Sequence, residues 1–323
     1  MKQLNSKFVD EIVSHLPNKR RLAQYLIELL GIGKESAYRR MKSEIPFSFE
    51  EVAAVSGDLG LSLDQLLGLK ADSRFSFYFN FDVNKEPSDA YANMLAYDNT
   101  NMEKILSSSD MKITAVVNRI PLRFFPYKAL FKFDYCQYLY SIGNISLMTG
   151  FSDINVPPHI NDLHNQSTSF FSNLRNITCI IDSTVYSKII NEIQHYYRLK
   201  FISDEDLKLL QTELFELLAM YESTLRKGKN IAGSNYTVYY SLLNIDSNVV
   251  CVEYDNKCLL QVWVYPEGPI EISDISSIRG LQEKWIDSKI RNSVLVSKTN
   301  DTLQIEMLHE VQKQISELTN LAS

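Results

Sequence analysis

One glycine between two short helical patterns constrains this chain more than any other feature. Residues 26–30 place apolar side chains on one face of a helix, and Gly31 follows where a tight turn needs a positive φ angle. A second helix is predicted over residues 34–42, with Ala37 and Met41 four residues apart on its inward face. Two short helices joined at such a turn form a helix-turn-helix, so we expect a small helical bundle here.

The residues around this turn follow a known pattern. Its parts are Leu30-Gly31-Ile32-Gly33, Ala37, Tyr38-Arg39-Arg40, Ser43-Glu44-Ile45-Pro46, Phe49-Glu50-Glu51-Val52, Leu59-Gly60-Leu61-Ser62-Leu63-Asp64 and Leu66-Leu67-Gly68. Over residues 18–68 the chain resembles the Cro/repressor-type (Xre-like, lambda repressor-like) helix-turn-helix family, which implies binding to double-stranded DNA. The segment GKESAYRRMKSEIPFSFEE is also similar to the sequences of a group of helix-turn-helix proteins typical of Bacteroidota. Beyond residue 68 the resemblance implies no chemistry.

Two positions depart from the family pattern. Gly33 replaces the usual Ser that caps the second helix, which weakens that cap slightly. Ser43 replaces the usual Gly after that helix, so a left-handed ending there costs some strain.

The outward face of the predicted helix 34–42 carries basic and hydrogen-bonding side chains, as entry into the major groove requires. Arg39 can address a guanine edge with two hydrogen bonds, and Glu35 either accepts from cytosine or counters the nearby cations. Base contacts are predicted for the positions that match the exposed face of the family's recognition helix: Lys34, Glu35, Ser36, Tyr38 and Arg39. Phosphate contacts are predicted for Lys19, Arg20, Arg40 and Lys42.

Charge is distributed unevenly along the chain. The whole chain carries a formal charge of −6, whereas residues 18–42 hold seven cations against two anions. A local basic surface is compatible with DNA binding, because screening limits the phosphate field to about one Debye length. The alternative interpretation is a solvated helix face.

The sequence predicts a cytoplasmic protein. The first 21 residues lack an apolar segment of signal-peptide length, and no later run approaches a membrane span of ~20 apolar residues. The four cysteines are isolated singles, which favours reduced and buried thiols. They are Cys136, Cys179, Cys251 and Cys258.

The predicted fold is multidomain, with an all-α five-helix head followed by an α+β body of antiparallel strands and long helices. The domains are 1–72, a middle region 74–230 and a C-terminal region 235–323, and the last two either stay separate or form one body. Head helices are expected at 4–16, 19–30, 34–42, 48–60 and 62–68.

In the body the pattern mixes long helices with short strands. Helices are expected at 88–108, 184–201, 203–226, 278–291 and 302–321, with Ser203 and Gly228 bounding the third. Strands are expected at 75–81, 112–118, 121–133, 236–245, 249–254, 258–265 and 294–296, with 236–265 as an antiparallel meander. Residues 135–148 fit either a helix or a strand, and 150–166 read as a loop.

No catalytic, cofactor or metal motif occurs in the sequence. His159 and His164 lie beside Asp162 in the Pro-rich segment, and we interpret them as solvated loop residues. We therefore expect no enzyme, no cofactor and no metal, although an active site can converge in a fold without a motif.

The combined prediction is a sequence-specific DNA-binding transcriptional regulator with a C-terminal sensing or oligomerisation region. The alternatives are a protein-interaction module built on a helix-turn-helix bundle, or an enzyme fused to a DNA-binding head. We also predict a homodimer through the body, with the long helix 203–226 and the terminal helix as material for the interface. The apolar stripe of the terminal helix either forms such a contact or packs on its own domain: Leu308, Val311, Ile315 and Leu318.

Overall fold

The computed structural model divides the chain into two compact units. The first, here called the head, is Met1–Ser76, and the second, the body, is Phe77–Ser323. The structure describes residues 2–16, 22–59, 61, 63, 78–79, 85–142, 149–246, 248–265, 268–272 and 279–318. The sequence placed the division near residues 72–74.

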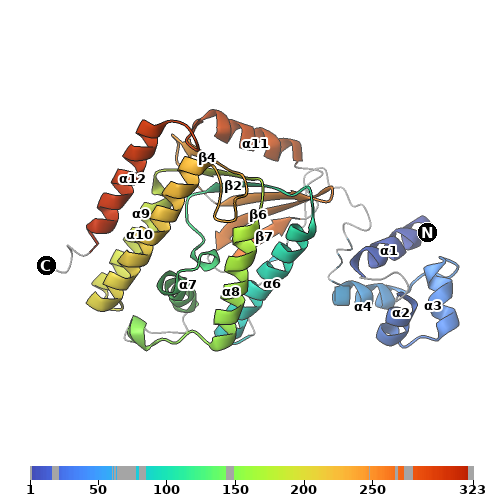
Figure 1. The fold of residues 1–323 in the computed structure, drawn as a ribbon. Coiled ribbons are helices and arrows are strands. Elements are labelled where there is room, and N and C mark those ends of the chain that lie inside the picture. The colour runs from blue at the N-terminus through green and yellow to red at the C-terminus, as the bar shows by residue number, and fades with distance from the viewer. Residues whose placement is uncertain are drawn as a thin grey trace. The chain divides into compact units, whose positions relative to one another are not determined.

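The head is a bundle of short helices around one core. Its helices are α1 (Lys2–His15), α2 (Leu22–Leu30), α3 (Lys34–Met41) and α4 (Phe49–Leu59) (Figure 1). The predicted helix 62–68 lies almost entirely outside the described residues. The core contains buried side chains from all four helices and Leu61 after α4: Phe8, Ile12, Leu22, Leu26, Ala37, Val55 and Leu61.

Local signals in the sequence explain the helix ends of the head. Gly31 has a φ of 64°, so the turn between α2 and α3 uses the left-handed conformation that glycine tolerates. Ser48 caps α4, because its hydroxyl accepts the Glu51 N–H at 3.2 Å while the Glu51 carboxylate accepts the Ser48 N–H at 2.9 Å. The predicted helix-turn-helix is confirmed, and the predicted helix 48–60 begins next to this cap.

Ser43 ends α3 in a strained conformation that α1 supports. Its φ is 55°, as the departure from glycine predicted. The Asn5 side-chain amide donates to the Ser43 hydroxyl at 3.1 Å, and its carbonyl accepts the Phe47 N–H at 3.1 Å. Asn5 thereby fixes the α3–α4 turn against α1.

The body contains one eight-stranded mixed sheet. Its strand order is β1-β7-β6-β5-β2-β3-β4-β8, and only the pairs β2–β3 and β3–β4 are parallel. Because β5 pairs with β2 and not with β4, the predicted antiparallel meander over 236–265 is wrong at its first strand. The strands are β1 (Tyr78–Phe79), β2 (Lys112–Val117), β3 (Ile177–Ile181), β4 (Tyr236–Ser241), β5 (Val249–Tyr254), β6 (Lys257–Tyr265), β7 (Gly268–Ile272) and β8 (Ser293–Leu295).

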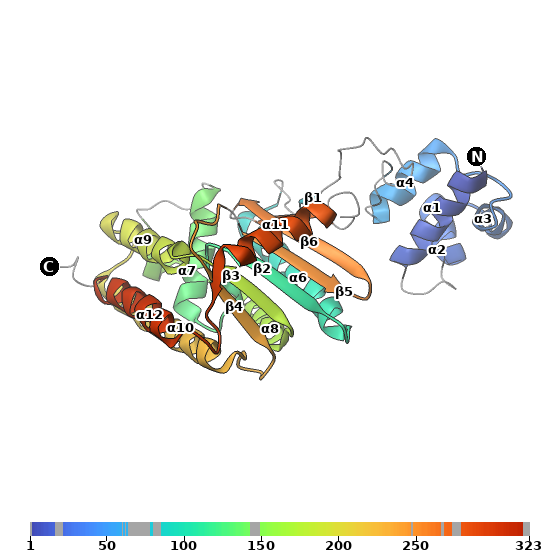
Figure 2. The ribbon, with the colours of Figure 1, turned by 90° about the horizontal axis from the view of Figure 1, so that it is seen from above.

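Helices cover both faces of this sheet. The helix α11 crosses one face, where Trp285 packs against strand residues, and α6, α7, α8 and α10 lie on the other (Figures 1 and 2). Parallel neighbours require crossover connections, and the chain between β2, β3 and β4 supplies them as helices. The body helices are α6 (Pro87–Ser107), α7 (Lys128–Ser141), α8 (Pro158–Asn173), α9 (Thr184–Arg198), α10 (Asp204–Lys227), α11 (Arg279–Arg291) and α12 (Asp301–Ser316), with 3-10 turns η2 (Leu122–Phe124) and η3 (Phe151–Asp153). None of the described helices combines the length and the apolar character needed to span a bilayer.

Two predicted segments have a different structure. Residues 121–133 form η2 and the start of α7 instead of a strand, because α7 is buried on most of its circumference and shows no helical periodicity. Residues 150–166 contain η3 and the start of α8 instead of a continuous loop, since Pro158 occupies the first helical turn, where proline is favoured. His164 is therefore not solvated: its ring stacks on Phe131 with centroids 3.7 Å apart.

The terminal helix packs on its own body. Ile315 and Leu318 are fully buried, and Leu308 and Val311 pack partly buried against the main body core. The helix α12 lies against α9 and α10 (Figure 2). The intramolecular interpretation of this stripe is confirmed, and the stripe is not available as a surface for a second copy.

Candidate nucleic-acid interface

The exposed face of α3 carries the predicted base-contacting residues. Ala37 is fully buried and anchors the helix on the head core, while Tyr38 keeps 44% of its surface exposed. Lys34, Glu35 and Arg39 are exposed, and Ser36 is half-buried. The structure thus places all five residues on one short helix, four of them exposed, around a single buried anchor.

Arg39 is held loosely enough to reach a ligand. Its Nε lies 3.8 Å from a Glu44 carboxylate oxygen, and both side chains are about half exposed. An exposed ion pair at this distance contributes about 0–1 kcal/mol, so a guanine edge or a phosphate can compete with Glu44.

Arg40 has a structural role that the sequence did not reveal. Its guanidinium donates from Nε and Nη2 to the two Glu51 carboxylate oxygens at 2.8 and 2.7 Å, and it also donates to the Ser36 carbonyl at 3.3 Å. Only 15% of the Arg40 side chain is exposed. Arg40 therefore holds α3 to α4, and its guanidinium is less available to a phosphate than the exposed cations of this face.

The remaining predicted phosphate contacts divide into two groups. Lys42 is exposed at the C-terminal end of α3. Lys19 and Arg20 lie outside the described residues. At the other end of α3 no described side chain caps the helix, so the N–H groups after Gly33 remain available to a phosphate oxygen.

The head also exposes apolar surface, which the sequence did not indicate. Phe49 in the first turn of α4 is 77% exposed, and Leu4 on α1 is 42% exposed. Phe49 occupies an outward helix position, while Val52 and Val55 turn inward.

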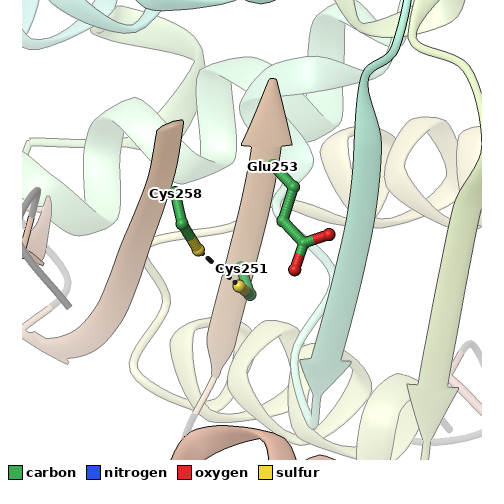
Figure 3. A group of neighbouring side chains, drawn as sticks. All are labelled: Cys251, Glu253 and Cys258. Carbon is green, nitrogen blue, oxygen red and sulfur yellow. Dashed lines mark hydrogen bonds between the residues drawn. The ribbon is translucent and has the colours of Figure 1, made fainter. Parts of the chain in front are cut away.

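A second constellation lies in the body, where two cysteines that the sequence treated as isolated meet. Cys251 and Glu253 project from β5 and Cys258 from β6, and the two sulfurs are 3.2 Å apart (Figure 3). Their hydrogen bond lowers the pKa of Cys258, and Arg279 lowers it further, against the effect of burial. All four cysteines are free and buried, as predicted.

This trio is the one described group whose ligand atoms, within 4.8 Å of one another, could hold a metal ion. It supplies three donors, whereas a structural zinc site uses four. Lys112 lies 4.0 Å from the Glu253 carboxylate and Arg279 acts on Cys258, so positive charge already neutralises the trio. The arrangement fits a hydrogen-bonded thiol pair better than a metal centre.

The body contains a buried charged cluster that no pattern in the sequence predicted. Arg123 lies 3.3 Å from Asp134, which also accepts the Tyr91 hydroxyl at 2.8 Å. The three residues come from η2, α7 and α6. Because they are separated along the chain and each belongs to an ordinary apolar segment, only the tertiary contact identifies them.

One comparison with known proteins gives a match. The model of the BetR domain family matches residues 8–101, which include the second half of α1, all of α2, α3 and α4, and most of α6. BetR domains are helix-turn-helix-like DNA-binding domains, so the match indicates a DNA-binding regulatory domain in this part of the chain. No curated protein and no solved structure gives a significant match.

Proposed function

We propose that this chain is a sequence-specific, cytoplasmic DNA-binding regulator of transcription that reads the major groove with α3. The main observation in support is the exposed face of α3, which carries Lys34, Arg39 and Lys42 together with Ser36 and Tyr38. The opposite side of the helix is buried in the head core, as a groove-reading helix requires. The BetR match over the same helices supports DNA binding independently of that geometry.

The residues divide by role. Arg39 and Ser36 are suited to base edges, because a guanidinium pairs with guanine and a hydroxyl donates or accepts. Lys42 and the N-terminal N–H groups of α3 are suited to phosphates, which position the helix without reading sequence. Lys19 and Arg20 remain proposed phosphate contacts.

We further propose that the protein acts as a homodimer. One module of this size reads a half-site, and specific binding by helix-turn-helix proteins ordinarily uses two half-sites about one DNA turn apart. Since α12 is occupied within the body, the contact must use other surfaces C-terminal to residue 74.

The test is selection of bound sequences from a random DNA pool with the full-length chain. A recovered motif supports sequence-specific binding, and a palindromic motif supports the dimer. A pool without enrichment would contradict the proposal. The exposed Phe49 would then favour the alternative, a head that docks another protein, and the Phe49→Ser variant would test that alternative in a pull-down with an identified partner.

A further inference from the structure

The body contains a large, partly open cavity on the sheet face opposite α11. Its volume is about 750 Å³, within the range of sites for small organic molecules. Strands β2, β3 and β5 form its floor through side chains that alternate onto one face of the sheet, including Ile113, Ala115, Ile177, Cys179 and Val250. Residues of α6, α7, α8 and α10 form its other walls.

Most of the cavity wall is apolar and aromatic. Phe124 and Phe171 stack with centroids 5.4 Å apart, and Phe125, Tyr138 and Trp263 also line the space. A well-packed core leaves few voids larger than a water molecule. A space of this size therefore fits a ligand with a substantial apolar part.

The wall also contains a polar group without a protein partner. The Tyr221 hydroxyl on α10 is buried and makes no hydrogen bond within the described part of the chain. Buried hydroxyls are ordinarily satisfied, because an unmade hydrogen bond costs about 1–3 kcal/mol. This hydroxyl indicates that the cavity receives a molecule with at least one polar atom.

The charged end of the cavity lies between α6, η2 and α7. Arg123 and Asp134 form an ion pair there and neutralise each other. Glu271 on β7 is also close to this end and accepts hydrogen bonds from Tyr97 and Gln261. These carboxylates already have donors, so neither needs a ligand.

Asp98 differs from its neighbours. Its carboxyl lines the cavity, and no hydrogen bond from a described residue acts on it. Burial raises the pKa of Asp98 to about 7, Arg123 counteracts this rise, and Glu271 adds to it. Asp134 pairs with Arg123 and Glu271 has two donors, so Asp98 is the carboxyl of this cluster that lacks both a donor and an ion pair among the described residues.

None of the other charged side chains of the wall forms an ion pair with Asp98 in the described part of the chain. Arg119 is paired with Glu192 at 3.0 Å. Lys188 contributes one positive and Asp246 one negative charge to the wall, and Asp246 is exposed to solvent. The Asp98 carboxyl lines the apolar space from α6 without a donor or an ion pair of its own among the described residues, which favours a cationic group on an otherwise apolar molecule.

We propose that the body binds a small hydrophobic amine, with its protonated nitrogen on Asp98 and its apolar part over the floor of β2, β3 and β5. This site goes beyond the DNA-binding function and does not depend on it, because every residue that forms it belongs to the body. A bound ammonium group supplies Asp98 with the hydrogen-bond donor and the ion pair that the described residues do not provide.

The test measures binding of octylamine, 1-octanol and octanoate to the full-length chain by calorimetry, without DNA. Octylamine should bind saturably and about tenfold more tightly than either analogue, because one charge-assisted hydrogen bond contributes about 1.4 kcal/mol or more. The variant Trp285→Phe leaves Trp263 as the sole tryptophan of the chain, so a change in its fluorescence should report occupancy of the cavity.

Asp98→Asn keeps the shape of the side chain and removes its charge. Octylamine binding should weaken about tenfold in this variant while 1-octanol binding stays unchanged. Asp246→Asn is the matched control and should leave both unchanged. Equal binding of the three probes, no saturable binding, or an equal loss of octylamine binding in both variants would overturn the proposal, whatever the result with DNA.

Discussion

Arg40 and Glu51 form two parallel hydrogen bonds, Nε to Oε2 at 2.8 Å and Nη2 to Oε1 at 2.7 Å. The same Glu51 carboxylate accepts the Ser48 N–H at the start of α4. The pair therefore fixes the helix that carries the proposed base contacts to the capped end of the next helix. A cation within a basic stretch of the sequence thus has a structural partner inside the head.

Breaking this pair should destabilise the head. Arg40→Ala and Glu51→Ala should each lower the free energy of opening of α3 by about 1–3 kcal/mol, because each leaves a charged partner with unmade hydrogen bonds. Amide hydrogen exchange of the full-length chain measures this energy. The double variant should lose at least about 0.5 kcal/mol less than the sum of the singles, and strict additivity would contradict the coupling.

The head should fold alone. Residues 1–76 form a separate compact unit with their own apolar core, so the fragment should be helical and unfold cooperatively. Circular dichroism during thermal unfolding checks this expectation. Sedimentation of the fragment and the full chain at matched concentrations should give a monomer and a dimer, respectively. A molten fragment or a dimeric head would show that the division of roles is wrong.

Acid should weaken the head through Glu51. Burial opposes ionisation of this carboxyl, but hydrogen bonds from Arg40 and from the Ser48 N–H outweigh it, and the pKa lies below the ordinary value of 4.5. The stabilisation is complete above the unfolded-state pKa and is lost as the pH falls through the lower folded-state pKa.

The corresponding experiment is thermal unfolding of residues 1–76 between pH 7 and pH 3. The melting temperature should fall below about pH 4.5, and Glu51→Gln should reduce this dependence while lowering stability at neutral pH. The control is Glu35→Gln, which changes an exposed carboxyl on α3. If both variants show the same pH profile as the wild type, the assignment to Glu51 is incorrect.

Substitutions of Arg39 and Lys42 should have different effects on DNA binding. Arg39→Ala should weaken binding to the selected site by about 1–3 kcal/mol and relax base choice at one position. Lys42→Ala should weaken binding to all sequences similarly and reduce the slope of log affinity against log salt by about one. Titrations with matched and scrambled DNA at two salt concentrations distinguish the two effects. Identical behaviour of the two variants would place α3 outside the groove.

Local chemistry explains where sequence and structure agree. Gly31, Ser48 and Gly228 ended or capped helices as predicted, since a left-handed residue or a side-chain cap acts within a few residues. The capping box of Ser203 and Asp206 is also present in α10. The helices α6 and α10 were predicted within about two residues because their apolar periodicity is strong.

Errors arose where burial removes the periodic signal. The helix α7 is apolar on most sides, so its sequence pattern resembles a strand. Strands β3 and β7 were not predicted, and their neighbours in the sheet come from distant parts of the chain. Pairing of this kind is decided by which faces can be buried together, and a one-dimensional pattern does not contain that information.

By itself the sequence determined the helix-turn-helix, its exposed basic face and its separation from the rest of the chain, because these depend on turns, caps and periodicity over a few residues. Tertiary structure alone decided that Arg40 bonds to Glu51, that Cys251 meets Cys258 and that Asp98 faces a cavity. Each of these depends on the distance between groups carried by different elements. The energy of a charge or a hydrogen bond depends on the neighbouring groups and on burial. Both are defined only once the chain has folded.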